Sequence, residues 1–314
     1  MADLSILIPA RNEEFLARTI QAILENIEGD TEVIAVLDGQ WADPGIPQHD
    51  RVTVVYLPVS VGQRAATNLA CRLSTAKYVM KVDAHCNFAK GFDRILMEDM
   101  QDDWTVVPTM RNLWAFDWKC HHCGWKKYQG PKPAKCKDCG RGDRIKRKMM
   151  WVGKERPQSN SFCFDATPHF QYFNDYTKRP GEAEKMLVET MSLQGSCFMM
   201  TREKYWSLGI CDEGEFPSWG SQGIEVACKT WLSGGSVMVN KKTWYAHLFR
   251  TQEGFSFPYR QSESKIQEAK AKARDLFFNN KWPKAKRPLS WLVKKFWPIP
   301  GWTQEDLDRL DGIM

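Results

Sequence analysis

Tyr78-Val79-Met80-Lys81-Val82-Asp83-Ala84-His85 is the stretch that decides how this chain is organised. Its apolar residues are typical of a buried strand, which runs directly into the pair Asp83 and His85. Because side chains alternate along a strand, residues separated by one position point to the same side. A carboxylate and an imidazole at a strand end predict half of a divalent cation site, with open positions for a ligand's oxygens. A polar turn after the strand explains Asp83-Ala84-His85 equally well. The choice between a cation site and a turn therefore depends on the neighbouring motifs.

Strands and helices alternate before this stretch. Apolar strands are expected at 4–9, 32–37 and 52–57, and amphipathic helices around 16–24 and 62–73. Alternation at this pace predicts an α/β fold, with a mostly parallel, doubly wound sheet flanked by helices. Ligands of such sheets bind beyond the carboxyl ends of the strands, so Pro9, Arg11, Glu13, Asp38 and Asp83 are expected in one site.

The classical nucleotide-binding motifs do not occur. The chain has neither Gly-x-Gly-x-x-Gly nor a Walker sequence, so a dinucleotide fold of the usual kind and a P-loop are not supported. A nucleotide can still be held by a carboxylate on its base and by a metal on its diphosphate. Asp38 and the Asp83/His85 pair suit these two roles.

Four cysteines have the most specific spacing in the chain. Cys120 and Cys123 form one Cys-x-x-Cys pair, and Cys136 and Cys139 form a second after twelve intervening residues. Two such pairs complete a tetrahedral sulfur site, so residues 119–143 predict an inserted zinc ribbon. Four thiolates leave no open coordination position, which indicates a structural Zn²⁺ and not a catalytic one. Docking on nucleic acid and a purely structural insertion remain equal alternatives for the ribbon.

Charge is unevenly distributed. The net charge is +6, but residues 119–156 alone carry +10 and residues 264–297 carry +8. Two basic blocks on an otherwise acidic chain indicate a polyanionic partner, and a solubilising surface explains them equally well. No apolar run reaches 18 residues, so no membrane span is expected. The N-terminus does not resemble a signal peptide and the ten cysteines suit free thiols or metal ligands, which predicts a cytoplasmic protein.

Two later segments carry further candidates. Phe216–Glu225 is a Gly-rich turn with Trp219 that leads into a helix, and it predicts either a wall of a sugar pocket or a plain loop packed by its tryptophan. His247 is a candidate third metal ligand, and Arg250 is a candidate phosphate contact. The tail from about residue 262 is expected to be helical, and its amphipathic part at 289–297 to pack on the core, in preference to a membrane or a nucleic acid.

Together these motifs resemble the GT-A nucleotide-sugar glycosyltransferases, and among them the polypeptide N-acetylgalactosaminyltransferases. The family's Leu-Asp-Ala-His-Cys-Glu is matched by residues 82–87, its Trp-Gly-Gly-Glu-Asn-x-Glu in part by 219–225, and its His-Val-Phe-Arg by 247–250. Their order and spacing agree from about residue 4 to 250, excluding the ribbon. The resemblance implies a GT-A fold in two halves, residues 1–118 and 144–260, around the ribbon, with a basic tail at 261–314.

The resemblance also implies chemistry. It predicts a hexosyltransferase, retaining as the family is, that uses a UDP-sugar and Mn²⁺ or Mg²⁺, with Asp83, His85 and His247 as metal ligands. Asp38 is expected to bind uracil and Arg250 to lie near the diphosphate. Gln222 and Glu225 are expected to be catalytic residues. The residues expected to bind the donor are Pro9, Arg11, Glu13, Arg64 and Trp219.

Departures from the family concern the sugar and the acceptor. Gln222-Gly223 replaces the family's Glu-Asn, so the sugar is expected to differ from N-acetylgalactosamine. The ribbon and the basic blocks favour an acceptor hydroxyl on nucleic acid, such as a hydroxymethylated base in DNA. A glycan, lipid-linked or protein acceptor is the alternative, and a zinc-dependent nucleic-acid-binding module with an inactive transferase fold is a third interpretation.

Overall fold

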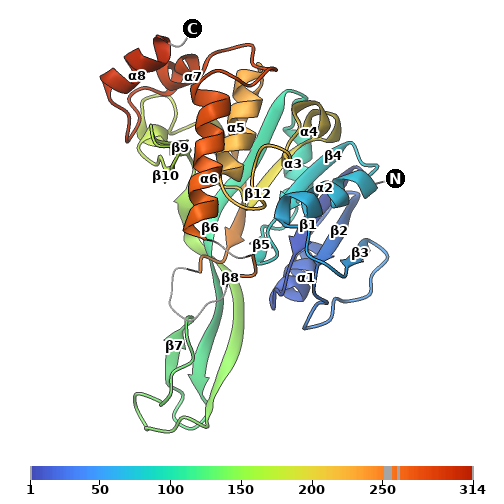
Figure 1. Ribbon diagram of the computed structural model, residues 1–314. Coiled ribbons are helices and arrows are strands. Elements are labelled where there is room, and N and C mark those ends of the chain that lie inside the picture. The colour runs from blue at the N-terminus through green and yellow to red at the C-terminus, as the bar shows by residue number, and fades with distance from the viewer. Residues whose placement is uncertain (1, 251–256, 260–261, 313–314) are drawn as a thin grey trace.

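The computed structural model describes residues 2–250, 257–259 and 262–312. Its centre is a sheet in which the strands follow the order β11-β13-β6-β12-β4-β1-β2-β3. Helices cover this sheet, and a long β-arm extends away from it (Figure 1).

The first half of the sheet is parallel, as predicted. It consists of β1 (Leu4–Ala10), β2 (Thr31–Asp38), β3 (Val52–Leu57) and β4 (Tyr78–Val82), with the helices α1 (Leu16–Asn26) and α2 (Gln63–Leu73) between them. All seven residues of β1 are buried, which is expected of a strand covered on both faces. The carboxyl ends of β1, β2 and β4 therefore meet at one edge.

The second half makes the sheet mixed. Strand β12 (Cys197–Thr201) runs antiparallel to β4, whereas β6 (Trp104–Cys120) and β13 (Ser236–His247) are parallel to each other. The shorter strands β5 (Cys86–Phe88) and β11 (Leu187–Glu189) pair with β13, and α3 (Phe92–Glu98) follows β5. The α/β class is confirmed.

The predicted ribbon is the end of a longer arm. The outer part of β6 pairs with β8 (Ile145–Ser159), from Met110 opposite Ser159 to Cys120 opposite Ile145, and β7 (Lys126–Tyr128) adds a short third strand. Figure 1 shows this arm projecting from the body, with β7 near its end. The expected boundary between residues 118 and 119 therefore falls inside β6, because one continuous strand belongs to both the core sheet and the arm.

The C-terminal half supplies most of the helical cover. It contains α4 (Arg202–Leu208), α5 (Gln222–Leu232), α6 (Glu263–Ala273), the π-helical turn η2 (Arg274–Phe278), α7 (Leu289–Phe296) and α8 (Gln304–Asp311). Between the arm and β11 lie β9 (Phe162–Phe164), β10 (Phe170–Tyr172) and the 3₁₀ turn η1 (Tyr176–Lys178). Leu289, Leu292, Val293 and Phe296 of α7 are buried in the main core, so the amphipathic tail packs on the body as expected. None of the helices in the described part of the chain has the length and apolar character needed to cross a bilayer.

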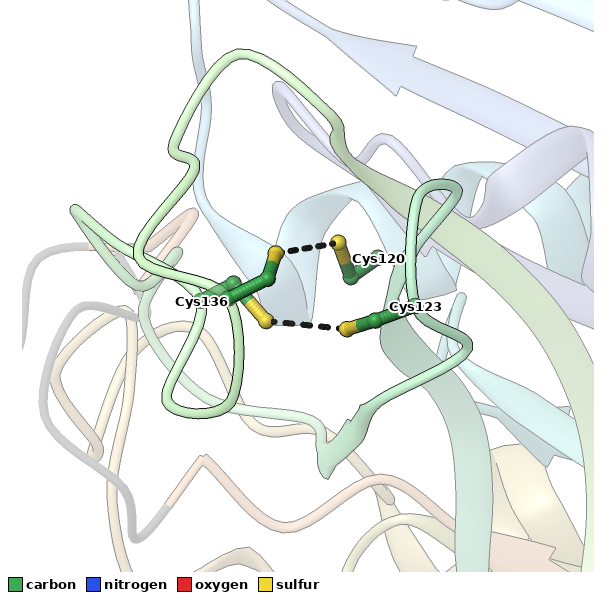
Figure 2. A group of neighbouring side chains, drawn as sticks. Cys120, Cys123 and Cys136 are labelled. Carbon is green, nitrogen blue, oxygen red and sulfur yellow. Dashed lines mark hydrogen bonds between the residues drawn. The ribbon is translucent and has the colours of Figure 1, made fainter.

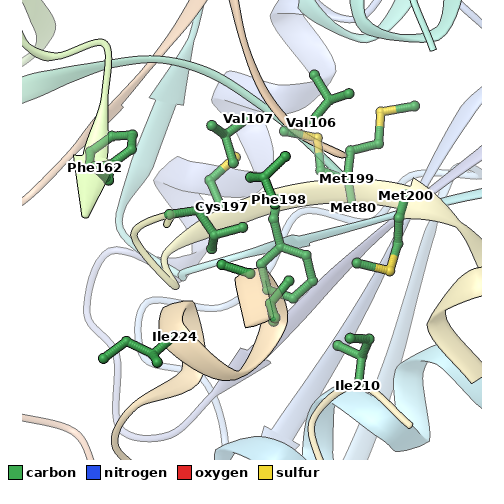
Figure 3. Close-up of a cluster of buried hydrophobic side chains, with 14 of the residues drawn as sticks. Met80, Val106, Val107, Phe162, Cys197, Phe198, Met199, Met200, Ile210 and Ile224 are labelled. Atoms are coloured by element: carbon green, nitrogen blue, oxygen red, sulfur yellow. The ribbon is translucent and has the colours of Figure 1, made fainter. Parts of the chain in front are cut away.

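The core lies where the two halves of the sheet meet. Met199 of β12 lies beside Met80 of β4 and Val106 of β6 on one face of the sheet. Phe198 of β12 points to the other face, and Ile224 of α5 belongs to the same core cluster (Figure 3). These side chains are at most 3% exposed, and burial of each contributes roughly 1.5–3 kcal/mol. This packing holds the strand ends that carry the polar site.

Candidate active site and metal centres

Asp83, His85 and His247 meet at the edge of the sheet. Asp83 and His85 follow the end of β4, and His247 is the last residue of β13. Cys86 of β5 pairs with His247, which brings the two segments together across 161 positions of sequence. One ligand atom from each of the three residues lies within 4.8 Å of the others. The described geometry suits three ligands of a divalent cation with open positions.

The protonation state of His247 fits a role as a metal ligand. Its Nδ1 is buried and has no hydrogen-bond partner among the described residues, and its Nε2 lies 3.3 Å from Oδ2 of Asp83. Burial lowers the pKa of His247 to about 4, against the hydrogen bond to Asp83, which raises it. The imidazole is therefore neutral near pH 7, which is the form that binds metals.

Other charged groups hold the ligands in place. Oε2 of Glu13 lies 3.1 Å from Nδ1 of His85, and Arg250 in turn donates to Glu13. A carboxylate behind a histidine ligand fixes the ring and leaves its other nitrogen for the metal. Lys81, which is 1% exposed, donates to Asp83 and to the carbonyl of Gly195. Burial opposes ionisation of Asp83, but Lys81 and His247 lower its pKa well below the usual range.

A cavity of about 280 Å³ opens over the three ligands. Of the residues expected at the donor, Pro9, Arg11, Glu13, Trp219 and Arg250 line it. A second cavity of about 340 Å³ adjoins it, shares Asp83 and Trp219, and is lined by Gln222. The two cavities provide room on both sides of the metal ligands.

Asp38 lies beside the cavity and not in its wall. Its carboxylate accepts hydrogen bonds from Ser60 Oγ, Val61 N and Gly62 N at 2.6–3.0 Å, and it is fully buried. Ser60 also accepts from Arg11 at 2.7 Å. The carboxylate therefore organises the loop after β3, and its expected contact with uracil stays a prediction.

Arg64 and Glu225 also differ from expectation. They form an ion pair that is at most 2% exposed, and Lys229 donates to the same Glu225 at 3.0 Å. Arg64 further donates to the carbonyls of Pro217 and Gly220 at 3.0 and 2.8 Å. The pair thus lies behind the site and holds the loop that carries Trp219, because a charge this deep requires a partner.

Sequence reasoning missed several wall residues. Lys81 was visible as one cation in an apolar strand, a pattern that indicates a buried partner. Gln63, which donates to Asp83 at 3.3 Å, Gln194 and Tyr259 had no comparable signal. Burial, together with the Asp38 carboxylate, raises the pKa of Tyr259.

The four cysteines of the arm converge on one point, as Figure 2 shows for three labelled members. Sγ of Cys120 lies 3.7 Å from that of Cys139, and Sγ of Cys123 lies 3.4 Å from that of Cys136. A disulfide requires about 2.0 Å, whereas tetrahedral Zn–S bonds of about 2.3 Å give sulfur–sulfur edges of about 3.8 Å. The donor set and its dimensions fit a zinc ion.

The two knuckles have the same backbone geometry. Gly124 N donates to Cys120 O and Gly140 N donates to Cys136 O, both at 2.9 Å. The glycines have φ of +83° and +73°, a left-handed conformation that other residues rarely adopt. Both turns therefore aim two thiols at the same side, as their spacing predicts.

Comparison with known proteins agrees with this geometry. Residues 5–129 match the model of the glycosyl transferase family 2. Human polypeptide N-acetylgalactosaminyltransferase 3 is 24% identical over 265 residues, which cover 81% of this chain and 38% of the relative. The putative polypeptide N-acetylgalactosaminyltransferase 13 of Drosophila melanogaster is 23% identical over 277 residues, covering 82% and 43%. The chain thus spans about two fifths of the length of these relatives.

A solved structure extends the likeness to the fold. The crystal structure of GalNAc-T7 with UDP, GalNAc and Mn²⁺ superposes with a TM-score of 0.61 at 14% sequence identity, over 98% of this chain and 54% of that chain. The chain therefore has the GT-A fold, matches the glycosyl transferase family 2 over residues 5–129, and resembles the polypeptide N-acetylgalactosaminyltransferases.

Proposed function

We propose that this protein is a metal-dependent glycosyltransferase that transfers a sugar from a UDP-sugar to an acceptor hydroxyl. The observation that carries the proposal is the cluster of Asp83, His85 and His247 inside a cavity at the carboxyl edge of the sheet. The family 2 match and the GT-A fold support it. The neighbour that holds UDP and Mn²⁺ supports the choice of nucleotide and of Mn²⁺ over Mg²⁺.

The residues around the cavity have separable tasks. When bound by the three ligands, a divalent cation supplies Lewis-acid stabilisation for a departing diphosphate. Arg11 and Arg250 bring positive charge to the same wall, which suits phosphate oxygens. Trp219 provides an aromatic face for a sugar ring. Gln222 lines the adjoining cavity, where the transferred sugar or the acceptor has room.

For the acceptor, we propose a hydroxyl on nucleic acid, in particular on a hydroxymethylated base of DNA. The charge of the arm supports this choice. The alternative is a hydroxyl of a protein, and the names of the polypeptide transferases among the relatives favour it. A cytoplasmic location fits the ten cysteines, which are all free thiols in the structure.

UDP release measured with a panel of UDP-sugars and Mn²⁺ tests the transferase. One sugar is expected to be hydrolysed slowly without an acceptor. Asp83→Asn is expected to reduce that rate about 10²–10³-fold, because it removes a charged metal ligand. Asp102→Asn, an exposed position at the opposite edge of the sheet, serves as the matched control and should leave the rate unchanged. Equal rates for the two variants would refute the proposal.

The same assay separates the acceptors. Stimulation by DNA that contains hydroxymethylated bases, with sugar incorporated into the DNA, is expected. Stimulation by serine- and threonine-containing peptides alone would refute the DNA acceptor and retain the transferase.

A further inference from the structure

One face of the arm carries a row of lysines on three neighbouring strands. Lys119 of β6 lies directly opposite Lys126 of β7 on one side and Lys146 of β8 on the other. Residues directly opposite each other in an antiparallel sheet point to the same face, and neighbouring strands are about 4.8 Å apart. Three positive charges therefore lie side by side within about 10 Å.

The same face continues with further lysines. The next row consists of Tyr128, Asp117 and Lys148, and the ammonium of Lys154 lies 4.4 Å from the centre of the Tyr128 ring. Asp117 is 4% exposed and accepts a hydrogen bond from Trp114, so its carboxylate is turned away from solvent. We call this surface, defined by Lys119, Lys126, Lys146, Lys148 and Lys154, the lysine face.

No ion pair joins a lysine of this face to a carboxylate within residues 2–250, 257–259 and 262–312. Like charges directly opposite each other destabilise a sheet by about 0.2–1 kcal/mol per pair. A bound polyanion removes this repulsion, whereas a merely solubilising surface does not require three lysines in one row.

The other face of the arm is different. Trp118 lies opposite Arg147, whose guanidinium stacks on Phe116 at 4.5 Å and forms an ion pair with Glu14 of the body. This face, which also carries Lys127 opposite Trp118, fastens the arm to the body beside Phe15. The attachment to the body thus lies on one face, and the row of three lysines lies on the other.

The arm also leads to the metal ligands. Asn112 of β6 pairs with His247, and eight residues further along the strand lies Cys120. At about 3.3 Å per residue, the cysteine cluster is about 26 Å from the root of the arm. One continuous strand therefore joins the lysine face to the proposed active site.

We propose that the lysine face binds the phosphodiester backbone of nucleic acid, and that the zinc site keeps this docking surface folded. Among the described residues of the arm, only Met149 and Val152 are large exposed apolar side chains, which disfavours a membrane surface. The proposal deepens the proposed function by placing the nucleic acid that would carry the acceptor, but binding is measured without turnover.

Fluorescence anisotropy of a labelled 20-base-pair DNA with the zinc-loaded protein tests the proposal. The triple variant Lys119→Gln, Lys126→Gln, Lys146→Gln is expected to bind at least about tenfold more weakly at 0.1 M salt. The slope of log K against log salt should fall by about 2 to 3, since each lost phosphate contact removes about 0.9.

A control variant with the same change of charge lies away from the arm. Lys77→Gln, Lys178→Gln, Lys185→Gln alters three exposed lysines and should keep the affinity within twofold. Zinc content and UDP-sugar hydrolysis should be unchanged in both triple variants, which shows that the fold and the donor site are intact. Equal affinity and salt slope of the two variants would overturn the proposal.

Three further outcomes also test the docking surface. Competition by poly-glutamate at the same charge concentration as DNA would overturn the nucleic-acid class and identify an acidic polypeptide as partner. Loss of UDP-sugar hydrolysis in Asp83→Asn with unchanged DNA affinity would support the docking surface by itself. A transferase that is active on peptides and does not bind DNA would refute the docking surface while the proposed function stands.

Discussion

The two candidate metal centres of this protein are built in opposite ways. The cysteine cluster takes its four ligands from two knuckles of the same design that lie thirteen residues apart along the arm. The Asp83, His85 and His247 cluster takes its side chains from segments 162 positions apart in the chain, which the pairing of β5 with β13 brings together. The first is a local structure, and the second depends on the whole sheet.

Their surroundings differ in the same sense. Four thiols satisfy a zinc ion completely, whereas three ligands beside a cavity of about 280 Å³ leave positions for substrate oxygens. Buried charges surround the open centre: Lys81 and Glu13 contact its ligands directly, and Arg64 and Glu225 hold its wall. A closed centre stabilises a fold, and an open centre has to be held by the fold.

The largest effect is expected from a substitution that removes one ligand of the closed centre and leaves the open centre unchanged. Cys136→Ser is expected to abolish binding of one zinc ion per chain, because structural zinc sites contribute an apparent 10–16 kcal/mol of binding free energy. Limited proteolysis should then cut between residues 120 and 145, while the thermal unfolding of the body and UDP-sugar hydrolysis remain unchanged. Cys71→Ala, a buried thiol outside the cluster, is the control and should retain zinc.

This prediction assumes that the body of the protein folds independently of the arm. A collapse of donor hydrolysis together with the loss of zinc would contradict the separation of the two centres.

A smaller effect, on the free energy of unfolding, is expected from the buried charges that hold the wall of the open centre. Glu225→Gln should lower the free energy of unfolding by about 3–5 kcal/mol, because it leaves Arg64 and Lys229 buried without their carboxylate. Denaturant titration measures this loss. Glu28→Gln removes the partner of Arg94 at the surface and should cost at most about 1 kcal/mol.

The pH dependence gives a second measure of the same pair. Burial opposes the charge of Glu225, but Arg64 and Lys229 keep its pKa below the usual 4.5. The unfolded state therefore binds the proton first as pH falls, so this stabilisation is present above pH 4.5 and is lost below it. The Glu225→Gln variant should lack this part of the acid destabilisation, and an unchanged pH profile would contradict the assignment.

The smallest effect is expected from a residue that orients a metal ligand without binding the metal itself. Glu13→Gln should weaken Mn²⁺ binding about 10–100-fold, because the carboxylate that orients His85 becomes a neutral amide. Isothermal titration with Mn²⁺ measures the change. Glu14→Gln, at the neighbouring position with its partner on the arm, is the matched control. Equal affinities would show that Glu13 does not position the ligand.

Prediction from sequence succeeded where the pattern is local. The strands and helices up to residue 82 follow from apolar periodicity, and the cysteine knuckles follow from their spacing, because neighbours in sequence determine both. The boundary of the ribbon could not be predicted, because β6 continues without interruption from the core sheet into the arm. Asp83 and His85 were candidates from their place at a strand end and His247 as a third ligand, the family resemblance then implied the same set, and their geometry is consistent with it.

By itself, the sequence determined the α/β class, the parallel first half of the sheet, the four-cysteine cluster and the identity of three candidate metal ligands. Only the tertiary structure decided which charges support the open centre and which line it. Arg64, Glu225 and Asp38 look like binding residues in sequence, but the packing of α2, α5 and the loop after β3 directs them away from the cavity. The lysine face likewise exists only because strand pairing places Lys119 between Lys126 and Lys146. The local sequence does not show which residues will be opposite each other in a sheet, so this face could not be predicted from it.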